Sequence, residues 1–399
     1  MFLKANIVID IYCSVLKGEL GRKIVSGIML SLLLTSILTL AFNIQPARSV
    51  PTTWTVDNNG PADFSLIQDA VNAASPGDII QVKAGTYYEN VVINKTVSLV
   101  GENRANTIID GNKTDSTVFV TDANNFTISG FTIQGAGAFF GMPAGIYLKN
   151  SNNSVVHNNI FRNNTLAAVW VWYCDNSAVS GNVIIDNVGT ALDVSSSNNV
   201  TIESNTIRNN EYGISLFFAD NCTIIKNTVT GSEDFGIAID GSGNVVVENT
   251  ISYNDEGINL YGSELATYDN EIYHNNFIGN DWQALSGGLV SFWDDGYPSG
   301  GNYWSDHVCT GNPSDGSQPY VIGIDSVDHY PFQDRNGWYI PGDVNGDGIV
   351  DILDLRICAK AFGSKLVDIN WNPSVDLNQD ELIDIFDLRK IAKHYGEHL

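Results

Sequence analysis

Two segments near the C-terminus carry oxygen-bearing side chains at the spacing of a calcium-binding loop. In residues 343–354 such residues occupy loop positions 1, 3, 5, 9 and 12, and position 7 offers a backbone carbonyl; the expected ligands are Asp343, Asn345, Asp347, Ile349, Asp351 and Asp354. Gly348 stands at position 6, where such a loop turns sharply. A hard cation needs this many oxygens from one flexible loop, so we expect one calcium ion here.

The same frame returns 33 residues later. Its expected ligands are Asp376, Asn378, Asp380, Leu382, Asp384 and Asp387, with Leu382 contributing its carbonyl. Glu381 stands where the first loop has glycine, and a side chain at that position strains the turn. We therefore expect a second calcium ion, bound less tightly than the first.

Each loop is followed by a segment with the apolar spacing of a helix. The apolar positions are Leu355, Cys358, Ala359 and Phe362 after the first loop, and Leu388, Ile391, Ala392 and Tyr395 after the second. Gly363 and Gly396 follow, where a helix C-cap is expected. A lone acidic loop is usually a solvated turn, whereas two matched loop–helix units predict a duplicated calcium module.

Upstream of the module, six segments align at intervals of 21 to 23 residues: GIYLKNS (145), AVWVWYC (168), ALDVSSS (191), GISLFFA (213), GIAIDGS (236) and GINLYGS (257). Their second and fourth positions are aliphatic, the alternation of a strand with one buried face. A second feature recurs with nearly the same spacing, namely an asparagine; these residues are Asn159, Asn182, Asn205, Asn227, Asn249 and Asn270. We expect these asparagines to form tight turns with a left-handed backbone, and to hydrogen-bond from coil to coil.

A period of about 22 residues suits one coil of three short strands and three turns. One coil is too thin to bury its own aliphatic face, so the coils must stack around a continuous core. We predict an all-β parallel β-helix with three sheets, followed by a small α-helical calcium module. A short amphipathic helix within residues 63–74 should cover the first coil, and the aromatic, glycine-rich residues 293–307 should cover the last.

The outward positions of the aligned strands supply further candidates for chemistry. The aromatic residues, which could stack on sugar rings, are Tyr147, Trp170, Trp172, Phe217 and Tyr261. The candidates for catalysis are Asp193 and Asp240. Because they lie two coils apart in alternate columns, roughly 10 Å or more should separate them, which exceeds the about 5–9.5 Å of a glycosidase pair. The aromatic column fits a carbohydrate groove, and equally a surface covered by another domain or a glycan.

Residues 65–111 (SLIQDAVNAASPGDIIQVKAGTYYENVVINKTVSLVGENRANTIIDG) resemble the opening of NosD-like and pectin-active proteins of the pectate-lyase-like superfamily. The segment WDDGYPSGGNYWSDH (293–307), followed by VDHYPF, is similar to the ending of NosD-type β-helices in microbial surface proteins. The resemblance covers most of residues 54–333 and implies a right-handed helix. The NosD name suggests copper. Met142 is the only methionine outside the leader, and His157, His274, His307 and His329 are not at close metal-ligand spacing, so we expect no copper site.

Residues 342–396 resemble a type I dockerin, because both loops end in aspartate and neither is preceded by a helix. The resemblance implies two calcium ions and a β-sandwich partner of the cohesin kind. The recognition positions of that family, 10 and 11 of each loop, correspond to Ile352, Leu353, Ile385 and Phe386. These apolar pairs fit a docking face, and they fit equally a module packed against its own β-helix.

The N-terminal residues 1–49 have the pattern of an export signal, with basic residues before an apolar run at 24–42 and small residues near Ser49. The run is also long enough for an uncleaved anchor, which would be the chain's only membrane contact. The formal charge of −25 argues against affinity for nucleic acid or anionic lipid. The predicted organisation is a leader (1–49), N-terminal cap (50–90), coils (91–280), C-terminal cap (281–335), linker (336–341) and calcium module (342–399).

Four cysteines lie outside the leader, Cys174, Cys222, Cys309 and Cys358, and we expect free thiols. The alignment puts Cys174 and Cys222 in different columns two coils apart, beyond the roughly 7 Å that a disulfide spans.

Together these features favour a secreted or cell-surface protein. Its β-helix would bind carbohydrate or another surface component, and its calcium module would dock to a cohesin-like partner or stabilise the C-terminus. The alternative is a polysaccharide lyase, hydrolase or epimerase, although the Gly-His-Gly and Arg-Ile-Lys elements of polygalacturonases are absent and the coils hold few basic residues. A surface-layer spacer is a third interpretation.

Overall fold

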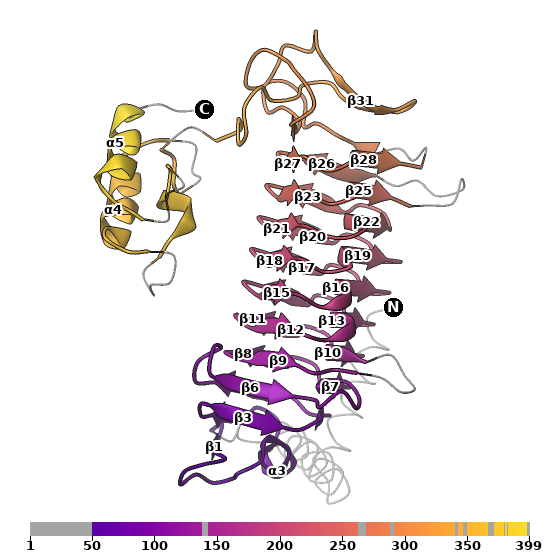
Figure 1. Ribbon diagram of the computed structural model, residues 1–399, viewed down its shortest axis with the longest axis vertical. Coiled ribbons are helices and arrows are strands. Elements are labelled where there is room, and N and C mark those ends of the chain that lie inside the picture. Colours follow the sequence, from indigo (N-terminus) through magenta and orange to yellow (C-terminus); the bar gives the residue numbers. More distant parts are fainter. Residues whose placement is uncertain are drawn as a thin grey trace, which may run out of the picture. The chain divides into compact units, whose positions relative to one another are not determined.

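The computed structural model describes residues 50–137, 143–261, 269–287, 291–339, 342–345, 349–365, 371–378, 380 and 382–396. The predicted leader, Met142, Asp347, Gly348 and Glu381 lie outside these ranges. Within them the chain winds as a parallel β-helix, in which successive coils add strands to three sheets (Figure 1). The predicted fold class is confirmed.

Each sheet grows by one parallel strand per coil. Sheet 1 contains β1 (Thr53–Val56), β2 (Ile79–Val82), β5 (Ser98–Gly101), β8 (Thr127–Ser129), β11 (Val155–His157), β14 (Ala178–Ser180), β17 (Thr201–Glu203), β20 (Thr223–Ile225), β23 (Val245–Val247), β26 (Asn270–Tyr273) and β29 (Ser291–Phe292). Sheet 2 contains β3 (Gly85–Tyr88), β6 (Thr107–Asp110), β9 (Thr132–Gln134), β12 (Ile160–Arg162), β15 (Val183–Ile185), β18 (Thr206–Arg208), β21 (Thr228–Thr230), β24 (Thr250–Ser252), β27 (Asn276–Ile278) and β30 (Tyr303–Trp304). Sheet 3 contains β4 (Val91–Ile93), β7 (Val118–Thr121), β10 (Ala144–Lys149), β13 (Thr165–Trp172), β16 (Val188–Ser195), β19 (Tyr212–Phe217), β22 (Phe235–Asp240), β25 (Glu256–Leu260) and β28 (Trp282–Ser286).

The aliphatic columns expected from the repeat line the core. In sheet 3, the second-position residues pair strand to strand and are all fully buried; they are Ile146, Val169, Leu192, Ile214, Ile237 and Ile258. Burying a side chain of this size contributes about 1.5–3 kcal/mol. Stacking is therefore what stabilises coils that have no separate core. Parallel pairing continues past Asn280 through β28, β29 and β30.

The predicted amphipathic helix is present as α3 (Ile67–Ala73), which contacts β1, β2 and β4 (Figure 1). Its Ile67, Ala70 and Val71 side chains are buried in the first coil. The carboxylate of Glu89 accepts hydrogen bonds from the backbone N–H groups of Ile67 and Gln68, at 2.8 and 2.9 Å. These bonds satisfy donors that have no partner inside the helix.

Buried asparagines form a ladder along the rod. The backbone N–H of each asparagine donates to the side-chain oxygen of the asparagine one coil further on; Asn205, for example, donates to Oδ1 of Asn227 at 2.9 Å. The side-chain nitrogen of Asn205 also donates to this oxygen and to the carbonyl of Val179. The ladder runs through Asn159, Asn182, Asn205, Asn227, Asn249, Asn275 and Asn302.

Two details of the asparagine prediction are wrong. Asn270 belongs to a different column, where it accepts from the backbone N–H of Asn244, and Asn275 takes its place in the ladder. The left-handed backbone falls on the residue before each ladder asparagine from Asn159 to Asn275, at Ser204, Lys226 and Glu248 for example. The preceding residue makes the sharp turn, and the asparagine is thereby free to point its amide inward.

The last ladder position is an aspartate. Asn302 donates its backbone N–H to Oδ2 of Asp328 at 2.7 Å, and Trp304 Nε1 donates to the same oxygen at 2.8 Å. Asp328 ends β32 (Ser326–Asp328), which pairs antiparallel with β31 (Tyr320–Gly323) in the cap. The stacked rings of Phe277, Trp304 and Tyr320 close the core beneath it.

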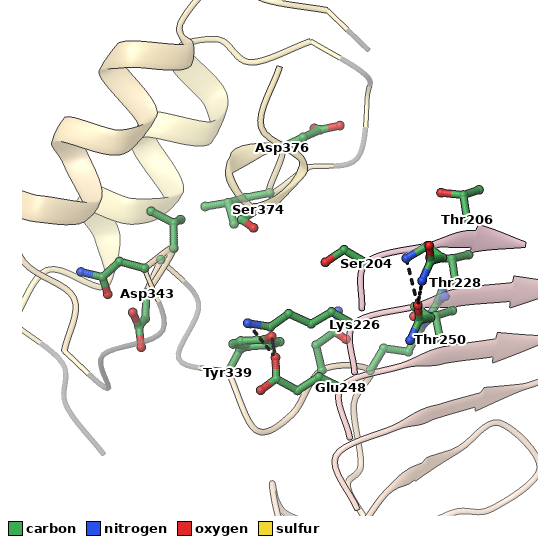
Figure 2. Close-up of a pocket in the computed structure, with 18 residues that line it drawn as sticks. Ser204, Thr206, Lys226, Thr228, Glu248, Thr250, Tyr339, Asp343, Ser374 and Asp376 are labelled. Atoms are coloured by element: carbon green, nitrogen blue, oxygen red, sulfur yellow. Dashed lines mark hydrogen bonds and ion pairs between the residues drawn. The ribbon is translucent and has the colours of Figure 1, made fainter. Parts of the chain in front are cut away.

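Residues 332–339 lie back along the coils. Asn336 and Asn276 exchange two hydrogen bonds, and the ring of Trp338 stacks on His274 with centroids 5.4 Å apart. Figure 2 shows Tyr339 beside Glu248, to which it donates a hydrogen bond, and Lys226 lies 3.6 Å from the same carboxylate. Most of the predicted linker is therefore fastened to the β-helix.

The calcium module contains α4 (Ile352–Ala361), the 3-10 turn η1 (Pro373–Val375) and α5 (Ile385–Lys393). Its core includes Val350, Cys358, Ala361, Ile383 and Ile391. The four predicted free thiols are unpaired and buried. None of the helices in the described ranges is long and apolar enough to cross a bilayer.

Candidate functional site

Three aromatic side chains form a flat shelf on the outer face of sheet 3. The indoles of Trp170 and Trp172 on β13 lie nearly parallel, with centroids 6.0 Å apart and planes at 20°. Tyr147 on β10 stacks on Trp170 at 4.7 Å and 15°. We call Tyr147, Trp170 and Trp172 the aromatic shelf.

Strand register explains how the shelf is built. Tyr147 pairs with Trp170, and Lys149 pairs with Trp172, so side chains of β10 cover one face of both indoles. The Nζ of Lys149 lies 5.1 Å from the centre of the Trp172 ring, within the range of a cation–π contact. The opposite indole faces point towards β16, where the paired residues are the smaller Asp193 and Ser195. A planar ligand could therefore stack on that side.

Asp193 lies beside this open side of the shelf. It accepts a hydrogen bond from the hydroxyl of Ser195, which in turn accepts from Trp170 Nε1 at 3.4 Å. Burial raises the pKa of Asp193, and the hydrogen bonds oppose that shift. The carboxylate is thus held in place as an acceptor.

The two catalytic candidates are not brought together. Asp240 pairs with Phe217, in the neighbouring outward column, and strand β19 lies between β16 and β22. Burial and the nearby charge of Asp220 raise the pKa of Asp240. Within the described ranges, no basic side chain influences the pKa of Asp193 or Asp240. The arrangement supplies separate acceptors and no acid–base pair.

Of the five aromatic candidates, Tyr147, Trp170 and Trp172 meet in the shelf. Phe217 contacts Phe218 at 4.4 Å two strands further along, and Tyr261 follows β25. Sequence reasoning missed Phe119, which packs on Tyr147 at 5.2 Å, and Tyr173, which packs on Trp172 at 5.1 Å. Phe119 lies one coil before the first aligned copy and has the same flanking pattern in VFVT, so extending the alignment would have found it.

The second calcium loop is wound so that its first ligands converge. The side-chain oxygens of Asp376 and Asn378 both accept from the backbone N–H of Asp380, at 3.2 and 3.1 Å. Oδ1 of Asp380 accepts from the N–H of Leu382 at 3.0 Å. The expected ligands at positions 1 and 3 therefore both turn their side-chain oxygens toward the backbone at position 5.

The position-12 aspartates have matching environments. Oδ1 of Asp354 accepts from Val344 and Asn345 at 2.9 and 3.2 Å, and Oδ2 accepts from Asp351 at 2.8 Å. Asp387 makes the equivalent three bonds in the second loop. Both side chains are fully buried. Every partner here is a neutral N–H group, so the charge of each loop fits a divalent cation.

The position-9 aspartates have an additional role. Asp351 accepts from the backbone N–H of Leu353 at 2.6 Å and caps α4, and Asp384 caps α5 in the same way at 2.7 Å. Figure 2 labels Asp343 and Asp376, which open the two loops. In the described ranges no three His, Cys, Asp or Glu side chains form a cluster that would hold a metal. The fit to calcium therefore depends on amide and carbonyl oxygens as well as carboxylates.

The four docking candidates are exposed: Ile352 (62%), Leu353 (46%), Ile385 (58%) and Phe386 (58%). No part of the described chain covers them. Phe362 and Tyr395, expected on the buried helix stripe, are also about half exposed, and Ala359 and Ala392 are exposed as well. Cys358 and Ile391 are buried as expected, and Ala361 joins them in the buried stripe, because the two helices pack on each other along that side.

The described residues do not fit a copper site. Three histidine rings each have another partner: His274 contacts the carbonyl of Ser299, His307 that of Gln318, and His329 the carboxylate of Asp294. Burial raises the pKa values of Cys174 and Cys222 to about 11, which disfavours the thiolates that copper would bind.

Curated relatives match only short parts of the chain. A segment of 117 residues, 29% of this chain, is 31% identical to a "Cell surface glycoprotein" of Methanothermus fervidus, of which it covers 18%. Another of 96 residues, 20% of this chain, is 33% identical to "Probable pectinesterase/pectinesterase inhibitor 6" of Arabidopsis thaliana, of which it covers 17%. The chain thus spans less than a fifth of either relative.

Two solved structures align with part of the chain. The Agl-KA catalytic domain aligns with a TM-score of 0.44 and 18% identity, over 55% of this chain and 44% of that one. The polygalacturonase from Erwinia carotovora ssp. carotovora aligns with a TM-score of 0.42 and 17% identity, over 62% and 84%.

Two family models match the sequence. The model described as "Periplasmic copper-binding protein (NosD)" matches residues 69–217 and 144–309, together more than half of the chain. The type I dockerin domain model matches residues 341–395. The chain therefore belongs to the NosD family of β-helix proteins, and carries a type I dockerin domain at its C-terminal end.

Proposed function

We propose that this chain is an exported, cell-surface β-helix protein that binds carbohydrate through its aromatic shelf. The observation that carries the proposal is the pair of nearly parallel indoles, covered on one side by β10 and facing small residues on the other. Sugar rings present C–H groups that pack on an aromatic face, and planar aromatic side chains lose little conformational freedom on binding. Asp193 and Ser195 beside the open faces would accept and donate hydrogen bonds to hydroxyl groups.

The cellular location is supported by two observations. The sequence begins with the pattern of an export signal, and one relative is named a cell surface glycoprotein. A β-helix with its caps (50–335) would then work outside the cell, with residues 342–399 as its attachment module.

We further propose that the dockerin domain attaches the protein to a cohesin-like partner when two calcium ions are bound. The exposed apolar pairs Ile352/Leu353 and Ile385/Phe386 support docking to a partner. Immobilised cohesin domains should retain the full chain in calcium and release it in chelator. Retention that ignores chelator would contradict this assignment.

The carbohydrate proposal is tested by retention of the full chain on a panel of immobilised polysaccharides. The wild-type chain should be retarded by at least one of them, and Trp170→Ala and Trp172→Ala should each weaken retention about tenfold or more, because stacking contacts are lost. Trp282→Ala is the matched control: this tryptophan is 62% exposed on the same sheet, outside the shelf. Retention that is equal in all three variants, or absent from the wild type, would refute the proposal.

A further inference from the structure

Beyond the open side of the shelf, small side chains line the outer face of sheet 3, and we call this strip the trough. Register places Asp193, Ser215 and Ala238 in one outward column that continues from Trp170. These side chains are small, so they form a low floor. We call Asp193, Ser195, Ser215 and Ala238 the trough floor.

Larger side chains border this floor on both sides. Tyr212 and Phe235 pack together on one side, with ring centroids 5.1 Å apart. Phe217 and Phe218 pack on the other, at 4.4 Å, and are 48% and 63% exposed. The shelf closes the trough at the end nearest the N-terminal cap.

The charged side chains on the strands that carry the shelf and the trough, from β13 onward, are all acidic. Strands β13, β16, β19, β22, β25 and β28 contain no lysine or arginine, whereas they contain Asp193, Asp240 and Glu256. Asp220 lies close enough to raise the pKa of Asp240 through its charge. The nearest strand cation, Lys149, lies over the Trp172 face that β10 covers, on the side away from the floor.

We infer that the shelf and trough bind a glycan without acidic groups, which deepens the proposed function and rests on it. Hydroxyl groups of a glycan can donate to the carboxylate of Asp193, and hydrogen bonds to charged acceptors are stronger than those to neutral ones. A uronate or sulfated sugar would instead place its anion among carboxylates in a partly desolvated site with no basic partner. Repulsion between the anion of such a sugar and these carboxylates would make the site prefer the uncharged glycan.

The test uses three forms of one glycan. A neutral polysaccharide retained in the panel is oxidised at C6 to its carboxylate, and part of that product is methyl-esterified to remove the charge. The Kd of the full chain should rise about tenfold or more for the carboxylate form at low ionic strength. High salt should reduce the difference, because screening acts over about 10 Å at 0.1 M. The methyl ester should bind close to the level of the neutral form.

Two variants separate a charge effect from a shape effect. Asp240→Asn should recover part of the affinity for the carboxylate form, because it removes a nearby negative charge. Thr206→Ala, on the outer face of sheet 2, should not. Equal or tighter binding of the carboxylate form would overturn this inference and leave the proposed carbohydrate function intact. A wild-type chain that no polysaccharide retains would instead refute the carbohydrate function itself.

Discussion

Gly396 and Val350 join the end of the calcium module to its beginning: the backbone N–H of Gly396 donates to the carbonyl of Val350 at 2.8 Å. The equivalent bond, 33 residues away in both partners, runs from Gly363 to Ile383 at 2.7 Å. The glycine after each helix thus bonds to position 8 of the other copy's loop. Both glycines have positive φ angles, which suit residues without a side chain. Each copy therefore helps to hold the helix end of the other copy in place.

Calcium removal should therefore unfold the whole module and leave the β-helix folded. Binding that is specific to the folded state stabilises it by mass action, and the loops hold their carboxylates together only when a cation balances them. Hydrogen exchange should show lost protection in α4 and α5 after chelation, with sheets 1–3 unchanged.

Stoichiometry tests the ligand assignment. Calorimetry should find two calcium ions for the wild type and one for either Asp354→Ala or Asp387→Ala. Asp315→Ala, an exposed cap aspartate, should still bind two. Helices that stay protected in chelator would show the ligand assignment to be wrong.

The docking face and the module core should respond differently to substitution on the same helix. Ile391→Ala removes a fully buried side chain of α5 and should cost roughly 2–5 kcal/mol of unfolding free energy. Phe386→Ser changes a side chain that is 58% exposed and should cost less than about 0.5 kcal/mol. Thermal unfolding in saturating calcium measures both. A large cost for Phe386→Ser would mean that another part of the chain covers it.

The middle of the asparagine ladder should be sensitive to truncation. Asn205→Ala removes the acceptor of two bonds from Asn182 and leaves the carbonyl of Val179 without its donor. Buried groups left without partners cost about 1–3 kcal/mol each, so a loss of about 3 kcal/mol or more is expected. Denaturant unfolding measures it, with the exposed neighbour Thr206→Ala as control. Equal effects of the two substitutions would mean that the ladder contributes little.

The cap should become less stable as pH rises. Burial raises the pKa of Asp328 to about 7, from an ordinary value of 3.8, while hydrogen bonds from Trp304 and Asn302 oppose the shift. The folded state therefore holds this proton more tightly than the unfolded state. Its contribution to the unfolding free energy is fully present below about pH 4 and is lost as pH rises through about 7.

The measurement compares melting temperatures of the wild type and Asp328→Asn at pH 5 and pH 8, in saturating calcium. The wild type should lose more stability than the variant between the two pH values. Identical pH profiles would show that Asp328 is already ionised in the folded protein at pH 5.

Period and alternation were enough to predict the β-helix, because each coil must place its aliphatic pair inward to contribute to a shared core. The same reasoning failed for Asn270, since the wider spacing of that coil hides which of two columns an asparagine joins. Asp328 could not be found from the repeat, because the cap chain reaches it through an antiparallel pair outside the coil pattern. Apolar spacing also misplaced Phe362 and Tyr395, since α4 ends at Ala361 and α5 at Lys393, before the helical stripe reaches these residues.

The asparagine ladder gives the rod a direction. In each coil of the ladder, the main-chain N–H of the asparagine donates to the side-chain oxygen of the next coil, so each coil offers this acceptor behind it and this donor ahead. Only the far end needs a residue that accepts without donating, and there the chain has a carboxylate. A duplicated coil inserted between β17 and β20 would thus find a match on both sides. The ladder is therefore compatible with coils added in the middle of the β-helix, whereas its first and last coils require different residues.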